Sequence, residues 1–126
     1  MTYDKYYVLI TDNNQSSFWQ SVYQGAYEYG LENNVYVEDL AATISDNLSK
    51  EELMRIAIAS KVDGIMLSAD DSVEMTELID EAVNSGIPVV TLYNDSSNSN
   101  RICYVGVGNY NIGKEYGSQT LSLASD

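Results

Sequence analysis

The chain has 126 residues, the length of a single domain, and carries 6 Lys and Arg against 19 Asp and Glu for a formal net charge of −13. So acidic a surface repels phosphate backbones and anionic membranes, and we expect no nucleic-acid binding through this segment. Because the sequence contains no histidine, Cys–His and Ser–His catalysis is excluded and a zinc or iron site is not expected.

Apolar runs of strand length alternate with segments of helical periodicity along the whole chain. In chain order, the predicted elements are a strand at 5–11, a helix at 17–33, a strand at 35–41, a helix at 49–60, a strand at 64–67, a helix at 72–84, strands at 88–92 and 102–105, and a helix at 109–123. This alternation is typical of a parallel sheet with helices on both faces. We therefore predict one α/β domain over residues 1–126, a doubly wound sheet of five strands in the order 2-1-3-4-5.

Two adjacent aromatic residues, Phe18 and Trp19, open the first predicted helix directly after an apolar strand. In open α/β sheets, ligands gather outside the carboxyl ends of the strands, and a rigid ring suits the apolar face of a sugar. We expect both rings to project into an open crevice. The alternative is that they are core residues at a helix start, as aromatic residues often are.

Hydrogen-bonding side chains follow most of the predicted strands, at 12–14, 68–71, 93–95 and 106–109. Asn and Asp oxygens, together with a ring face, suit a polyhydroxyl ligand better than a phosphate. The alternative is that these residues make turns and helix caps, which we favour for Asp71 and Asn109. The glycines near Asn109 lack the third glycine of a dinucleotide site, so a nucleotide site is not expected.

An acidic metal pocket is the competing interpretation of the strand ends. Asp12 and Asp70 could imitate the Mg²⁺ site of a phosphoacceptor receiver domain, a fold of similar length and strand order. That family has two acids after its first strand and a lysine at the end of its fifth. Here Asn13 follows Asp12, and no lysine ends the fifth strand.

Four segments together resemble the type I periplasmic sugar-binding protein family, the ribose- and galactose-binding group that includes the effector domains of lactose-repressor-like regulators. They are a helix start similar to Asn-Pro-Phe-Phe at 16–26, a strand similar to vDGiil at 61–67, a turn and strand similar to gIPVv-t at 82–91, and an element similar to yVg-x-dN at 104–113. Their order and spacing match nearly the whole chain. The resemblance implies an N-terminal lobe, with the second lobe outside this chain.

In that family the sugar lies between two lobes, stacked on aromatic rings and trapped by hinge closure. The resemblance therefore implies ligand-binding residues and no catalytic residue, metal or cofactor. The implied ligand-binding residues are Asp12, Ser16, Phe18, Trp19, Asp70, Tyr93, Asn94 and Asp95. Tyr93 stands where the commonest family residue is an aspartate, so a standard ribose or galactose specificity is in doubt.

The resemblance implies non-catalytic recognition of a sugar or sugar-like solute. The expected partners are the second lobe and an ABC permease or a sensor kinase, with self-association through the exposed cleft face as a further expectation. We expect an extracytoplasmic location. The alternative is the effector domain of a lactose-repressor-like transcription regulator, which would be cytoplasmic. The N-terminus shows no basic region followed by an apolar one.

Overall fold

The computed structural model contains one sheet of five parallel strands in the order β2-β1-β3-β4-β5, as predicted. It describes residues 3–12, 15–44, 47–106 and 113–125. The strands are β1 (Lys5–Ile10), β2 (Val35–Asp39), β3 (Gly64–Leu67), β4 (Val89–Leu92) and β5 (Cys103–Val105). The helices are α1 (Ser17–Glu32), α2 (Leu40–Ile44), α3 (Lys50–Ser60), α4 (Val73–Asn84) and α5 (Gly113–Ser125).

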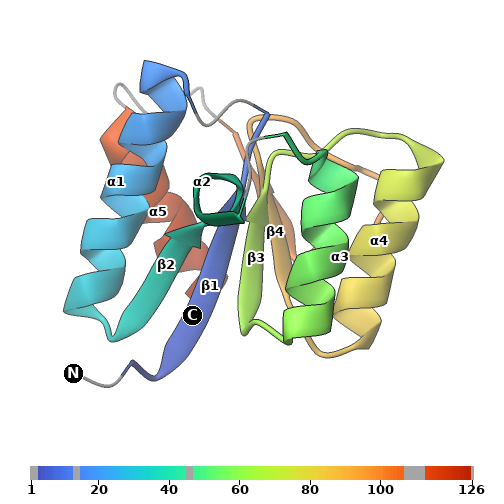
Figure 1. Ribbon diagram of the computed structural model, residues 1–126, viewed down its shortest axis with the longest axis horizontal. Helices are drawn as coiled ribbons and strands as arrows, with labels where there is room; N and C mark the ends of the chain where they lie inside the picture. The colour runs from blue at the N-terminus through green and yellow to red at the C-terminus, as the bar shows by residue number, and fades with distance from the viewer. Residues whose placement is uncertain (1–2, 13–14, 45–46, 107–112, 126) are drawn as a thin grey trace.

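Helices cover both faces of the sheet, so there are two apolar cores (Figure 1). Strand side chains alternate between faces. Val8 and Ile10 of β1 therefore pack with α3 and α4, whereas Tyr7 and Leu9 pack with α1 and α5. Burial on both sides explains why the strands read as continuous apolar runs. Within the described ranges, no helix combines the length and apolarity that a bilayer span requires.

The helix ends follow the predicted capping chemistry. Ser49 and Glu52 form a complete capping box at the start of α3, and the Ser72 hydroxyl accepts the backbone N–H of Met75 at the start of α4. Helix α4 ends at Asn84 and is capped by Ser85, before Gly86, whose φ of +89° is the left-handed conformation that glycine adopts without strain. These local signals fix the helix boundaries that the sequence predicted.

Helices α1 and α5 lie with their backbones in contact. A Cβ added to Gly117 would stand 1.8 Å from the carbonyl oxygen of Val22, and one added to Gly25 would stand 1.8 Å from that of Lys114. Glycine is therefore required at both positions, because no side chain fits between the two helices. This contact holds the start of α5 beside α1, whose first turn carries Phe18 and Trp19.

Helix α2 was not predicted, and the second strand was predicted two residues too long. The strand ends at Asp39. The Asp39 carboxylate accepts the backbone N–H groups of Ala41 and Ala42, and these hydrogen bonds start a helical turn. Burial nevertheless raises the pKa of Asp39. The predicted start of the last helix, at residue 109, lies outside the described residues, and its end is at Ser125.

Candidate functional site

A depression of about 490 Å³ opens at the carboxyl-end edge of the sheet, where β1, β3 and β4 all end. Its lining residues are Asp12, Lys50, Ala69, Asp70, Asp71, Asn94 and Asp95. Four of these were predicted as ligand-binding residues from the sequence. Parallel strands bring their carboxyl ends to one edge, so residues far apart in the chain meet there.

The Asp12 carboxylate is the centre of the polar network. Its Oδ1 pairs with the Nζ of Lys50, and its Oδ2 accepts the Ser68 hydroxyl at 2.8 Å and the Asn94 Nδ2 at 3.1 Å. The Asn94 Nδ2 also lies 3.3 Å from the Ser68 Oγ. These hydrogen bonds join the loops that follow β1, β3 and β4, so the polar surface at this edge is pre-formed.

Lys50 belongs to this site but was not predicted from the sequence. Besides Asp12, its Nζ donates to the carbonyl oxygen of Ser68 at 2.9 Å, and its side chain is only 18% exposed. A lysine at the first position of a helix looks like an ordinary solvated residue, and no local pattern distinguishes it. Only the fold brings α3 beside the end of β1.

Asp70 and Asp95, two of the acidic residues that line the depression, are each held by hydrogen bonds within their own loop. Asp95 accepts a bidentate pair of hydrogen bonds from Arg101, at 2.6 and 2.8 Å, and the Thr91 hydroxyl at 2.7 Å. The Arg101 guanidinium holds the pKa of Asp95 below its ordinary value. Asp70 accepts the backbone N–H of Ser72 at 2.9 Å, and hydrogen bonding with Ser72 lowers its pKa. Both carboxylates therefore organise turns as well as line the depression.

Aromatic rings gather next to this polar network. Phe18 lies 5.7 Å from Tyr93 and 5.0 Å from Trp19 between ring centroids, and Trp19 lies 5.6 Å from Tyr93. Trp19 is only 6% exposed and belongs to the core, so the expectation that both rings project into an open crevice is wrong for the indole. Phe18 is partly buried, and Tyr93 is 47% exposed. Tyr93 is therefore the open ring of the cluster.

Two further polar residues singled out from the sequence, Ser16 and Asp71, accept backbone N–H groups. The Ser16 hydroxyl accepts the backbone N–H of Trp19 at 3.1 Å, so it caps α1. Asp71, predicted to form a turn, accepts the backbone N–H of Ser97 at 3.0 Å. Asn109 lies outside the described residues.

Tyr116, which the sequence did not single out, is fully buried with its ring 6.3 Å from Phe18.

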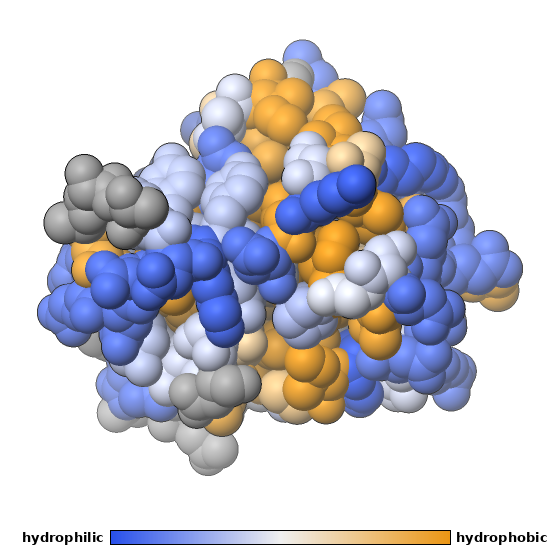
Figure 2. Space-filling model, turned by 90° about the horizontal axis from the view of Figure 1, so that it is seen from below, coloured by the Kyte–Doolittle hydropathy of each residue, from blue (hydrophilic) through white to orange (hydrophobic). Residues whose placement is uncertain are grey.

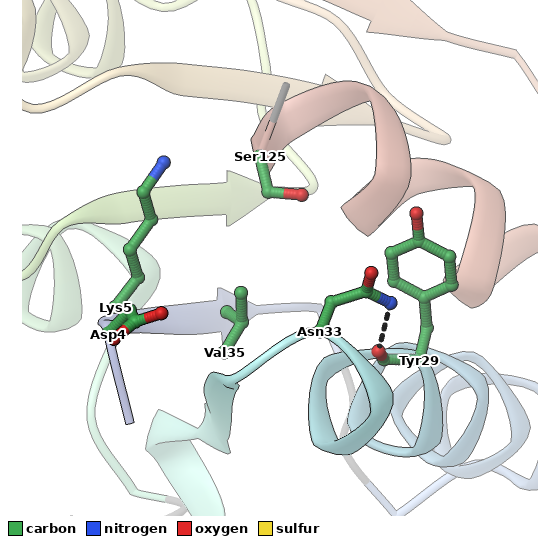
Figure 3. A pocket seen from close by; sticks show the side chains of 6 residues that line it. All are labelled: Asp4, Lys5, Tyr29, Asn33, Val35 and Ser125. Atoms are coloured by element: carbon green, nitrogen blue, oxygen red, sulfur yellow. Dashed lines mark hydrogen bonds between the residues drawn. The ribbon is translucent and has the colours of Figure 1, made fainter. Parts of the chain in front are cut away.

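The opposite edge, where the strands begin, has a different chemistry. Figure 2 shows this face from below, with hydrophobic surface over its middle flanked by strongly hydrophilic residues. One depression of about 210 Å³ lies there, lined by Asp4, Lys5, Tyr29, Asn33, Val35 and Ser125 (Figure 3). The Asn33 side chain is turned back onto the carbonyl oxygen of Tyr29 at 2.8 Å. This hollow lacks the linked polar network and ring cluster of the carboxyl-end edge.

Asp12 and Asp70, the two acids of the receiver-domain alternative, bond to different partners at the carboxyl-end edge. Lys50 pairs with Asp12, and the Asp70 carboxylate is turned to the start of α4. Across the described ranges, His, Cys, Asp and Glu side chains form no group of three suited to a metal ion. The carboxylates that line the depression act as hydrogen-bond acceptors within the loops.

A family model described as a periplasmic binding protein domain matches residues 6–124. GanP, a glucose-galactose binding protein from Geobacillus stearothermophilus, is 30% identical, with a TM-score of 0.72 over 87% of this chain and 39% of its own. AraP, an arabinose binding protein from the same organism, is 28% identical, with a TM-score of 0.69 over 85% of this chain and 37% of its own.

A mutant of the XylFII–LytSN complex contains a chain that is 30% identical, with a TM-score of 0.67 over 82% of this chain and 38% of that one. The chain thus spans less than two fifths of the length of each of these three structures. A search of curated proteins gave no match.

Proposed function

This chain belongs to the periplasmic binding protein domain family, and from that premise we propose that it binds a sugar or sugar-like solute without converting it. The observation that carries the proposal is the meeting of two surfaces at one edge. The polar network around Asp12 lies beside the ring cluster, and the adjacent residues Tyr93 and Asn94 belong one to each.

The two surfaces divide the recognition of a sugar between them. The exposed ring of Tyr93 and the partly buried ring of Phe18 offer apolar area to a sugar's ring face. Asp12 and Asn94 offer an acceptor and an amide to its hydroxyl groups. Trp19 supports both rings from the core. Asp70 and Asp95 line the depression and also hold the main chain of their own loops, whereas Ser16 caps the helix that carries the rings of Phe18 and Trp19.

We further propose that this chain is one lobe of a two-lobed binding site. The similar structures that name a sugar-binding protein are more than twice as long as the matched segment. A second lobe would close over the depression, and ligand contacts on both sides would stabilise the closed state. Such a protein would work outside the cytoplasm, and would pass its ligand to an ABC importer or report it to a sensor.

Two of the similar structures are named for a sugar ABC transporter and for a complex with a partner protein. One neighbour at 27% identity is the sugar-binding protein of a sugar ABC transporter from Bacillus halodurans, and XylFII occurs in a complex with LytSN. Neither user changes the chemistry proposed for the carboxyl-end edge. Binding of an isolated permease or kinase domain to the sugar-loaded, complete protein would distinguish them.

Nuclear magnetic resonance titration of the 126-residue chain tests the proposal. The probes are D-glucose, D-galactose, L-arabinose and myo-inositol, sugars and a polyol that similar structures name or hold. We expect chemical-shift changes centred on Asp12, Tyr93 and Asn94, with a Kd of about 1 mM or weaker, because one lobe supplies half of the contacts.

An Asn33→Ala variant, altered in the depression of Figure 3, is the matched control and should bind with the same Kd. Asn94→Ala should abolish the shift changes. Shift changes confined to the strand-start edge, or none with any of the four compounds, would refute the proposed site. Tight binding by this single lobe would refute the two-lobed arrangement.

A further inference from the structure

We propose that Tyr116 and Tyr104 are positioning residues whose hydroxyl groups hold the main chain of Tyr93 in the conformation that sets its ring in the candidate site. The main-chain role stands on geometry alone, and its effect on ligand binding rests on the function proposed above. Neither tyrosine belongs to the resemblance-based set of site residues, and neither lines the depression beside Asp12.

Tyr93 has an unusual backbone. Its φ is +69°, in the left-handed region that bulky side chains rarely adopt. Such a residue persists only where its surroundings hold it in place. It directly follows β4, at the carboxyl end of a strand, and its side chain is the exposed member of the ring cluster. The strained backbone therefore coincides with the proposed ligand surface.

Phenol groups satisfy both main-chain polar groups of Tyr93. Its N–H donates to the Tyr116 Oη at 2.7 Å, and its carbonyl oxygen accepts the Tyr104 hydroxyl at 2.9 Å. Tyr116 belongs to α5 and Tyr104 to β5, so two separate elements form hydrogen bonds with the main chain of Tyr93. The left-handed conformation is thus held on both sides of the Tyr93 Cα, through the two peptide units that flank it.

Tyr116 is suited to this role because a hydroxyl both donates and accepts. Its Oη donates to the carbonyl oxygen of Val105 while it accepts from Tyr93, and the residue is fully buried. Phenylalanine would keep the ring packing but could make neither hydrogen bond. The partly buried N–H of Tyr93 would then lose its acceptor, which costs stability.

Movement of Tyr93 would reach both halves of the site. Its ring contacts Phe18 and Trp19, and the next residue, Asn94, donates to Asp12. A change of φ at one residue redirects its side chain and the chain that follows it. The two hydroxyl groups therefore couple α5 and β5 to the ring surface and the polar network together.

The experiment compares Tyr116→Phe and Tyr104→Phe with two matched controls in the full 126-residue chain. Tyr7→Phe removes a buried hydroxyl that donates to the Ala124 carbonyl at 3.0 Å, and Tyr23→Phe removes a partly buried one that donates to the Val37 carbonyl at 3.0 Å. The readouts are the amide signal of Tyr93 and the fluorescence of Trp19, the single tryptophan of the chain.

In Tyr116→Phe we expect amide exchange at Tyr93 to accelerate about fivefold or more, with loss of the strong amide-to-α-proton Overhauser effect of a positive φ. Trp19 emission should shift, because its neighbouring ring moves. Tyr104→Phe should give the same changes at smaller size. Both control variants should leave these signals unchanged, even where they lower the melting temperature.

Retention of the positive-φ signature and of amide protection in both test variants would overturn the proposal. Affinity for D-glucose, D-galactose or L-arabinose provides the second arm. For any of these sugars that the unaltered chain binds, Tyr116→Phe should weaken the affinity by about threefold to tenfold. The two control variants should weaken the affinity by less than twofold. If none of the sugars binds to any variant, the proposed function fails, whereas the Tyr93 signals still decide the main-chain role.

Discussion

Lys50, the first residue of α3, pairs its ammonium with the carboxylate of Asp12, 38 positions earlier in the chain and just after β1. The side chain of Lys50 is 18% exposed and that of Asp12 is 39% exposed. The pair holds in place the Asp12 carboxylate, which links the loops after β1, β3 and β4. It also neutralises the charge of Asp12 in a depression that three further carboxylates line.

A double-mutant cycle should show that this ion pair stabilises the fold. We expect Lys50→Met and Asp12→Asn to couple by about 1 kcal/mol in the free energy of unfolding, because the pair is partly shielded from water. The Arg55–Glu74 pair, whose side chains are 53% and 57% exposed, is the matched control and should couple by about 0.5 kcal/mol or less. Urea denaturation measures both cycles, and equal coupling in the two would contradict this role for Lys50.

The ring of Tyr93 should contribute directly to ligand affinity. Tyr93→Leu should weaken sugar binding by about fivefold, since an aromatic ring contact is worth roughly 1 kcal/mol beyond its buried area. Tyr93→Phe keeps the ring and should lose threefold or less. Titration of both variants with the same sugar makes the comparison. Equal losses for Phe and Leu would mean that the hydroxyl, and not the ring, contacts the ligand.

Gly117 should not tolerate a side chain. Gly117→Ala places a methyl group 1.8 Å from the Val22 carbonyl oxygen, so α1 and α5 must separate. We expect a loss of about 2 kcal/mol or more in the free energy of unfolding. Gly106→Ala is the control, because among the described residues its Cβ would meet only a ring atom of Tyr104 at 3.7 Å, and it should change stability by about 0.5 kcal/mol or less. Similar losses for both would rule out the helix contact as the cause.

Acid should weaken the fold partly through Asp95. Its pKa is lowered in the folded chain by Arg101, so the folded state binds this proton less tightly than the unfolded state. The stabilisation is complete above the unfolded pKa of about 3.9 and is lost as the pH falls through the lower folded pKa. The free energy of unfolding of the unaltered chain should therefore fall more steeply below pH 4 than that of Asp95→Asn. Parallel curves from pH 6 to pH 2 would contradict this.

The sequence predicted the strands and nearly all helices because their causes are local, and the sheet order followed from the rules for parallel α/β folds. Apolar runs bounded by polar turns identify strands. Ser49 and Glu52, which are three residues apart, identify a helix start because they form a capping box. Helix α2 escaped prediction because it has only five residues and depends on one capping carboxylate, Asp39. A single polar residue after a strand does not show whether a turn or a helix follows.

The sequence alone determined the fold class, the family resemblance and the edge of the sheet at which the candidate polar side chains gather, since the carboxyl ends of parallel strands share one edge. Only the tertiary structure decided which groups face solvent there. It buried Trp19, exposed Tyr93, and brought Lys50 and Tyr116 to the site from distant helices. The physical reason is that exposure and long-range hydrogen bonds depend on how helices pack across the sheet, and no local pattern encodes that packing.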